Sequence, residues 1–391
     1  MKNPDKMAEF VREYLMTYRE QMILFLKDLV SIETPTEKVD SQLQILSKLK
    51  DSFMAMGYQV IHVYGQQTGG YLYARPLKRN KKLPIQLLIG HCDTVWPIGT
   101  IEKMPLTYKS GKIKGPGIYD MKAGLTQIVF SLMAIREMNI KPEVEPIVFI
   151  NSDEETGSRE STNALKRLAK IANRAYVLEP PLGLNGKLKT ARKGLGRFTI
   201  NVSGKAAHAG LDPGKGVNAI VELSRQVQRL YAMNDFEKGI TVNIGMIEGG
   251  ISPNVIAPSS KAVIDVRVLK KADGDFITKK IKSLKPVHKD VVMEIEGGIG
   301  RPPMEKTPRN QLLWEMAKRQ GQLLGLDLEE ATAGGGSDAN TTSLYTATLD
   351  GLGIPGDGAH AAHEHILENK LIERTALLTL LLLLEPIKIE T

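Results

Sequence analysis

Four short apolar runs in this sequence each lead into side chains that can bind metal or move a proton. The runs are residues 87–90, 147–150, 175–178 and 353–359, and they lead to His91, to Asp153, Glu154 and Glu155, to Glu179 and to His360. Segments with apolar residues at helical spacing, such as Leu125, Ile128, Val129, Leu132 and Ile135, lie between the runs. Strands that alternate with helices predict an α/β domain with a mixed, largely parallel sheet flanked by helices. Functional side chains gather at the carboxyl ends of such strands.

The alternation changes after residue 191. From about residue 195 to 296 the order strand, helix, strand, strand, helix, strand is typical of a ferredoxin-like α+β module. We therefore predict one α/β domain built from residues 1–192 and 303–391, with an inserted ferredoxin-like domain of residues 193–302. Apolar spacing also predicts helices near residues 6–30 and 41–56, and another that begins near Met121.

Composition excludes several other classes of protein. The single cysteine, Cys92, excludes an intramolecular disulfide framework. The net charge of +8 is scattered and lacks a basic stretch with interleaved aromatics, so we expect no nucleic-acid partner. Residues 376–384 form the longest apolar stretch, which falls short of the roughly 20 residues that span a bilayer. We expect a buried terminal helix there, no membrane partner, and a cytoplasmic protein.

Taken singly, the polar residues have ordinary structural explanations. Asp120 and Asp338 suit helix N-caps, Glu154 and Glu155 suit a solvated turn, and His360 suits a surface position. Taken together, His-x-Asp, an isolated Asp, Glu-Glu, Glu and His make the ligand inventory of a two-metal site. Imidazole and carboxylate ligands without thiolates favour zinc, and cobalt or manganese could substitute for it.

Seven motifs resemble those of one enzyme family, in the family's order along almost the whole chain. They are residues 91–95 (HCDTV), 115–124 (GPGIYDMKAG), 153–158 (DEETGS), 178–180 (LEP), 204–210 (GKAAHAG), 334–338 (GGGSD) and 360–364 (HAAHE). The sequence resembles the di-zinc metallopeptidase superfamily of glutamate carboxypeptidase (carboxypeptidase G), aminoacylase, acetylornithine deacetylase and succinyl-diaminopimelate desuccinylase. The resemblance implies a catalytic domain of the zinc exopeptidase type and an inserted domain that acts in dimerisation and as a lid.

The resemblance also implies roles for the metal-site residues. Two Zn²⁺ per chain would be bound by His91 and Glu179 on one side, by Glu155 and His360 on the other, and by Asp120 between them. Asp93 would orient the imidazole of His91. Glu154 would act as general base toward a metal-bridging water.

Substrate contacts follow from the same resemblance. His208 would reach the active site of the opposite subunit of a homodimer and stabilise the developing oxyanion, although it could instead only complete a local turn. The positions of Asn254, Arg267 and Gly335 match family residues that bind the substrate's oxygens and carboxylate. Lys187 and Arg301 match residues of the glutamate carboxypeptidase branch, or they could be ordinary surface charges.

The implied activity is hydrolysis of the amide bond in small N-acyl amino acids or short peptides with a free carboxylate, releasing a C-terminal amino acid such as glutamate. Met121 stands where the glutamate carboxypeptidase has an acidic residue, and Lys189, Arg192 and Lys193 make their segment more basic than its counterpart. Two alternatives stay open. One is a deacylase of the acetylornithine or succinyl-diaminopimelate type, and the other is a metal-binding homologue without hydrolytic activity.

Overall fold

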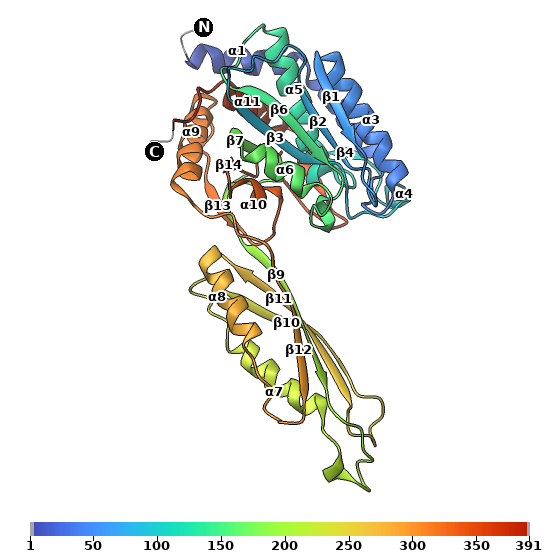
Figure 1. The fold of residues 1–391 in the computed structure, drawn as a ribbon. Helices are drawn as coiled ribbons and strands as arrows, with labels where there is room; N and C mark the ends of the chain where they lie inside the picture. Colours follow the sequence, from blue (N-terminus) through green and yellow to red (C-terminus); the bar gives the residue numbers. More distant parts are fainter. Residues whose placement is uncertain (1–3, 389–391) are drawn as a thin grey trace. The chain divides into compact units, whose positions relative to one another are not determined.

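Six strands form the central sheet of the larger of two structural units (Figure 1). In sheet order they are β1 (Tyr58–Val63), β2 (Tyr71–Pro76), β6 (Glu145–Asn151), β3 (Ile85–His91), β7 (Ala172–Val177) and β14 (Ala347–Leu349). Strands β6, β3, β7 and β14 are parallel, whereas β1 and β2 pair antiparallel. Every residue of β3 is buried, as is usual in a parallel sheet covered on both faces. The predicted mixed, largely parallel sheet is confirmed.

The computed structural model describes residues 4–388. The larger unit comprises the chain through Thr190, Lys306–Thr332 and the chain from Ser337 onward. The smaller unit comprises Ala191–Glu305 and Ala333–Gly336, so the glycine-rich segment groups with it. The outer limits of the predicted α/β domain, residues 1 and 391, lie outside the described residues.

Helices flank the central sheet of the larger unit. They are α1 (Pro4–Thr17), α2 (Arg19–Ser31), α3 (Val39–Ala55), α4 (Thr100–Lys103), α5 (Ala123–Glu137), α6 (Thr162–Ala169), α9 (Pro308–Leu323), α10 (Asp338–Thr342) and α11 (Lys370–Leu382). Helix α11 is buried along nearly its whole length, which confirms the predicted buried terminal helix. None of the helices between residues 4 and 388 is long and apolar enough to cross a membrane.

Two helix predictions differ from the structure in detail. The helix expected over residues 6–30 is broken at Tyr18, where the backbone leaves helical geometry between α1 and α2. The hydroxyls of Tyr14 and Tyr18 both donate to the distant Glu137 carboxylate, a contact that local sequence cannot reveal. Helix α5 has Lys122 at its N-cap position, because a π-helical turn (Ile118–Lys122) with non-helical dihedrals at Asp120 precedes it. The interpretation of Asp120 as a helix cap is therefore wrong.

Shorter strands complete the larger unit. Strands β4 (Thr107–Lys109), β5 (Lys112–Lys114), β16 (His365–Leu367) and β15 (Gly356–Asp357) form a second antiparallel sheet. Strands β8 (Leu188–Arg192) and β13 (Glu330–Ala333) form a two-stranded sheet, of which Ala191, Arg192 and Ala333 belong to the smaller unit. These short strands were not predicted from the sequence. Pairing of β16 with β5 ties the segment after His360 to the segment before Asp120, which matters for the site described below.

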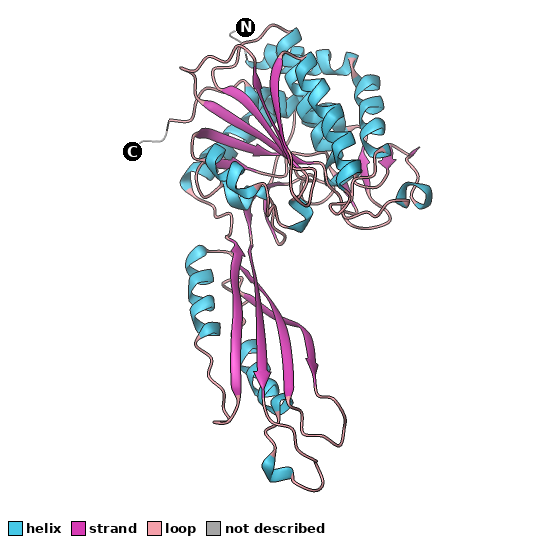
Figure 2. Ribbon diagram, turned by 45° about the vertical axis from the view of Figure 1, so that its right-hand side comes forward, coloured by secondary structure: helices cyan, strands magenta, loops and turns pink. Residues whose placement is uncertain are grey.

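The smaller unit is a four-stranded antiparallel sheet with two helices (Figure 2). Along the chain its elements are β9 (Gly194–Ser203), α7 (Ala219–Tyr231), β10 (Thr241–Gly249), β11 (Ser259–Val268), α8 (Lys271–Lys282) and β12 (Val292–Arg301), with a 3₁₀ turn at Pro213–Lys215. The sheet order β10-β11-β9-β12 is that of the ferredoxin-like module. Phe198, Ile200, Leu223 and Ile277 share one core, so both helices pack on the same apolar face of the sheet.

Candidate metal centre

Five ligand-type side chains of the larger unit converge where its parallel strands end. They are His91 at the end of β3, Asp120 in the π-helical turn before α5, Glu155 in the 3₁₀ turn Glu154–Thr156 after β6, Glu179 after β7, and His360 in the loop between β15 and β16. Strands β3, β6 and β7 are parallel neighbours, so their carboxyl ends meet at one edge of the sheet. The peptide bond between Asp120 and Met121 is cis.

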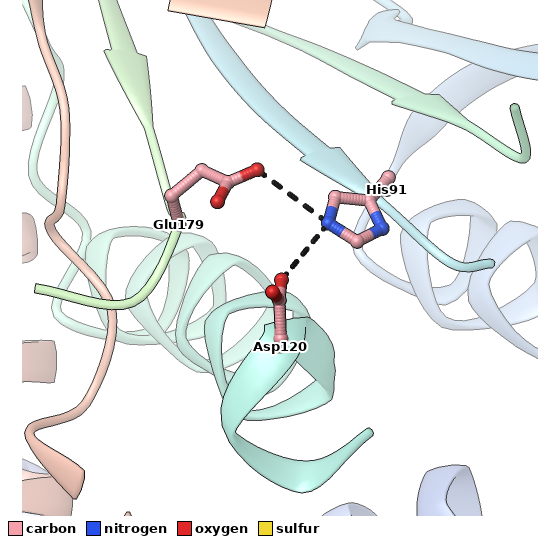
Figure 3. A group of neighbouring side chains, drawn as sticks. All are labelled: His91, Asp120 and Glu179. Atoms are coloured by element: carbon pink, nitrogen blue, oxygen red, sulfur yellow. Dashed lines mark hydrogen bonds and ion pairs between the residues drawn. The ribbon is translucent and has the colours of Figure 1, made fainter. Parts of the chain in front are cut away.

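Asp120 belongs to two groups of ligand-type side chains, one through each of its carboxylate oxygens. In the first group the Nε2 atom of His91 lies 3.2 Å from Asp120 Oδ1 and 3.5 Å from Glu179 Oε1 (Figure 3). In the second group the Nε2 atom of His360 lies 3.5 Å from Asp120 Oδ2 and 3.3 Å from Glu155 Oε2. Within each group the ligand atoms lie within 4.8 Å of one another, close enough to hold one metal ion. The sharing of Asp120 makes the arrangement a candidate two-metal site.

The pKa shifts and buried charges of the protein's own side chains suit the binding of cations at this site. Burial disfavours a charge on Asp120, but hydrogen bonds from His360 and His91 outweigh burial and hold the pKa of this carboxyl well below its ordinary value. Burial raises the pKa of Glu155, and its Oε1 atom is buried with no hydrogen-bond partner among the described residues. An unpartnered buried carboxylate oxygen is costly without a cation. The donor set of three carboxylates and two imidazoles therefore fits two divalent metal ions.

Both histidines carry a raised pKa in the absence of metal. Hydrogen bonds to Asp120 and Glu155 raise the pKa of His360 to about 10. Burial alone would lower the pKa of His91, but its hydrogen bonds to Asp120, Asp93 and Glu179 hold that pKa well above the ordinary value. Each ring lies between carboxylates, and a proton on it supplies a positive charge that a bound metal ion would replace.

Asp93 contacts His91 at Nδ1, the ring nitrogen that does not face Asp120 and Glu179. The Nδ1 atom of His91 lies 3.4 Å from Asp93 Oδ1 and 3.0 Å from the Asp93 carbonyl oxygen. The Asp93 carboxylate also accepts hydrogen bonds from the Thr36 hydroxyl and from the backbone N–H groups of Glu154 and Glu155. One buried carboxylate thereby fixes both the His91 ring and the turn that carries the two glutamates. Glu154 is itself almost buried in that turn, directly beside the ligand-type Glu155.

The remaining predicted residues form three sets. Lys187 is the first, His208 with Asn254 is the second, and the third surrounds the glycine-rich segment of the smaller unit. Lys187 of the larger unit forms an ion pair with Glu329 at 2.6 Å. In the smaller unit His208 and Asn254 lie together: the Ala209 N–H donates to the Asn254 carbonyl, and the exposed His208 ring accepts from the N–H groups of the following turn.

A second group within the smaller unit surrounds its glycine-rich segment. Arg267 pairs with Asp265 at 2.8 Å and donates to the Gly334 carbonyl, while the Gly335 carbonyl accepts from Arg192. The side chain of Arg301, at the end of β12, lies beside Gly336 in the same segment.

Glu364 stands in the 360–364 motif, but the sequence alone indicates no role for it. The structure places its buried carboxylate against the loop that carries Asp120. The spacing of four residues after His360 was the only local signal, and it does not indicate which loop the side chain contacts.

Comparisons with known proteins show the family of this chain. Over 366 residues the chain is 30% identical to carboxypeptidase G2 from Pseudomonas sp. (strain RS-16), and the match covers 90% of this chain and 86% of the relative. A model of the peptidase dimerisation domain of the M20 family matches residues 190–288. The chain belongs to the M20 peptidase family. This M20 peptidase is a carboxypeptidase-like metallohydrolase, as its relatives and its candidate metal site together indicate.

Solved structures share the fold of this M20 peptidase. Aminopeptidase PepT from Bacillus cereus superposes with a TM-score of 0.79 at 22% identity, covering 93% of this chain and 98% of that chain. A Bacillus subtilis protein described as a dinuclear metal binding peptidase of the M20 family superposes with a TM-score of 0.71 at 14% identity, covering 94% of this chain and 98% of that chain.

Proposed function

We propose that this M20 peptidase is a di-zinc carboxypeptidase that releases a C-terminal amino acid, such as glutamate, from small N-acyl amino acids or short peptides. The observation that carries the proposal is the position of Asp120, whose two carboxylate oxygens serve two separate groups of ligand-type side chains. The similarity to carboxypeptidase G2 supports cleavage next to a C-terminal residue.

In the proposed hydrolysis each of the site's residues has a separate role. When bound by the two groups, the metal ions supply Lewis-acid activation of a water molecule and of the scissile carbonyl. Glu154 takes the proton of the attacking water and later delivers it to the leaving nitrogen. Its place beside Glu155, with its backbone N–H donating to Asp93, keeps the buried Glu154 next to the ligands. Asp93 holds the His91 ring so that Nε2 faces Asp120 and Glu179.

Recognition of the substrate's free carboxylate is assigned to basic and backbone groups. Arg267 and Arg301 offer guanidinium groups, which bind carboxylates with two parallel hydrogen bonds. Lys187, Asn254 and Gly335 complete the proposed set. In the structure Arg267 is paired with Asp265, an arrangement that restricts the guanidinium to one orientation.

The proposed working form is a homodimer in which His208 serves the partner's site. The match to the peptidase dimerisation domain supports this assembly. Strand β10 forms an edge of the smaller unit's sheet, and it exposes the apolar side chains of Met246 and Ile247, with Ile251 just beyond. An exposed apolar edge strand is suited to pairing with another chain.

The test is hydrolysis of a panel of N-acyl amino acids and dipeptides that end in Glu, Asp, Leu or Lys, with metal-stripped protein refilled with zinc. Zinc-dependent release of glutamate above the other residues is the expected result. Preference for a different residue would remove the assignments of Lys187, Arg267 and Arg301 but keep the hydrolytic mechanism. Preference for N-acetylornithine or N-succinyl-diaminopimelate would favour the deacylase alternative.

The base is tested separately. Glu154→Ala should lower turnover by at least about 10²-fold while two metal ions per chain remain bound, as measured by metal analysis. Glu143→Ala, an exposed glutamate of the same unit, is the control and should retain wild-type turnover. Full activity of Glu154→Ala would exclude the assigned mechanism.

A further inference from the structure

Glu364 is a buried carboxylate that accepts four hydrogen bonds, two on each oxygen. Oε2 accepts from the Trp96 indole N–H at 2.7 Å and from the Gly117 N–H at 2.9 Å. Oε1 accepts from the N–H groups of Tyr119 at 2.9 Å and Asp120 at 3.1 Å. The side chain has no exposed surface. Three of the four donors are backbone groups of the single loop that carries the shared ligand Asp120.

The contacts of Glu364 join three segments that each carry a proposed metal ligand. Trp96 follows His91 by five residues, and Glu364 follows His360 by four. The backbone adds to the link, because the Gly115 N–H donates to the Glu364 carbonyl. Gly358 in the His360 loop has a positive φ, and a Cβ there would lie 2.8 Å from the Glu364 nitrogen. The close approach of these segments therefore depends on glycine as well as on the carboxylate.

We propose that Glu364 is the positioning residue of the metal centre: it fixes the backbone of Asp120 so that each oxygen of that carboxylate faces one ligand group. It is neither a ligand nor a base, since all four of its contacts are to N–H groups of the protein. The proposal rests on the proposed function, in which Asp120 is shared by two metal ions. Partners of metal ligands set ligand orientation and affect metal affinity without touching the ion.

The count of acceptor sites explains why a carboxylate is needed. Each of the two oxygens receives two donors, and an ionised carboxylate offers about four lone-pair sites. A glutamine of the same shape would turn an NH₂ group toward one pair of donors. That pair, either Trp96 with Gly117 or Tyr119 with Asp120, would then be left unpaired in a buried position. The loop would have to move, and Asp120 would move with it.

Glu33 offers a matched control. Its carboxylate also anchors a loop of the larger unit by accepting backbone N–H groups, from Gly99 and Ile101, each at 2.8 Å. That loop carries none of the proposed ligands. Glu33→Gln therefore makes the same chemical change at an anchoring carboxylate whose hydrogen bonds hold a loop without a proposed ligand.

The experiment measures Zn²⁺ affinity by competition with a chelator, and the visible absorption spectrum of the Co²⁺-loaded protein. Glu364→Gln should weaken the binding of both metal ions by about 10–100-fold and change the Co²⁺ spectrum. Glu33→Gln should leave both measurements as in the wild type. Wild-type affinity and an unchanged spectrum in Glu364→Gln would overturn the proposal. An equal loss in Glu33→Gln would also overturn it, because the effect would then be one of general stability.

Trp96→Phe keeps the proposal testable if Glu364→Gln does not fold. It removes one of the four donors and leaves the carboxylate and the three backbone donors in place. A loss of metal affinity in the same direction, smaller than about tenfold, is expected, and no change would contradict the proposal. Failure of the wild-type protein to bind two metal ions would instead refute the proposed function, so the two failures are distinguishable.

Discussion

Binding of zinc to the metal-free protein should release protons, because each imidazole must lose its proton before it can bind a metal ion. His91 Nε2 lies between Asp120 and Glu179, and His360 Nε2 lies between Asp120 and Glu155. The neighbouring carboxylates raise the pKa of His360 to about 10 and hold that of His91 well above its ordinary value.

The magnitude follows from the pKa of His360. At pH 8 a group with a pKa of about 10 is about 99% protonated. Filling its ligand group with zinc at pH 8 should therefore release about one proton per chain, and His91, whose pKa is also raised, should add to that number. Each displaced proton also makes the apparent zinc affinity rise by about tenfold per pH unit below the pKa.

Isothermal titration of metal-free protein with zinc, in two buffers of different ionisation enthalpy, measures the number of protons released. Replacement of the exposed His288 by Gln is the control and should not change that number. Release of fewer than about one proton per chain would refute the reasoning, since the histidines would then be neutral in the metal-free protein or would not bind the metal.

Three further predictions concern stability and affinity. Because the folded-state pKa of His360 is raised above the ordinary value of 6.5, its contribution to the stability of the metal-free protein is complete below pH 6.5 and disappears as pH rises through about 10. The melting temperature of metal-free wild type should thus fall over this range more than that of His360→Ala, and parallel curves would contradict the assignment. Asp93→Asn turns an NH₂ group toward buried donors, so zinc affinity measured by chelator competition should fall by about 10–100-fold. Wild-type affinity in this variant would show that the Asp93 carboxylate is not needed. Leu378→Ala in the buried helix α11 should lower the free energy of unfolding, measured in urea on the metal-free protein, by about 2–5 kcal/mol. A loss below about 1 kcal/mol would mean that this core can rearrange around the cavity.

The fold was predictable where apolar residues formed a long enough run, as in β3 and β6, or a recognisable period. The five strands from β1 to β7 in the central sheet and the elements of the smaller unit satisfy that condition. Strand β14 has three residues and β15 has two, so no period can be recognised in them. At the break at Tyr18 the side chain contacts Glu137, 119 residues away, and local spacing cannot reveal this contact.

The candidate site was predictable where its residues directly follow apolar strands. Ligand types placed after apolar runs mark the carboxyl ends of neighbouring strands, and His91, Glu155 and Glu179 lie there in the structure. The contact of Glu364 with Asp120 spans 244 residues and joins two loops rather than two strands. Loops have no periodicity from which such a contact could be predicted.

The two ligand groups differ in how far the protein alone fixes them. The imidazole of His91 is 2% exposed and is held on both ring nitrogens, by Asp93 on one side and by Asp120 and Glu179 on the other. The imidazole of His360 is 51% exposed. Asp120 links the groups, and its backbone is fixed by Glu364. A rigid, buried group lowers the cost of ordering ligands around a metal ion, whereas an exposed ligand gives water and substrate access to the ion. The protein alone therefore fixes the His91 group more fully, whereas the His360 group is the one more open to solvent.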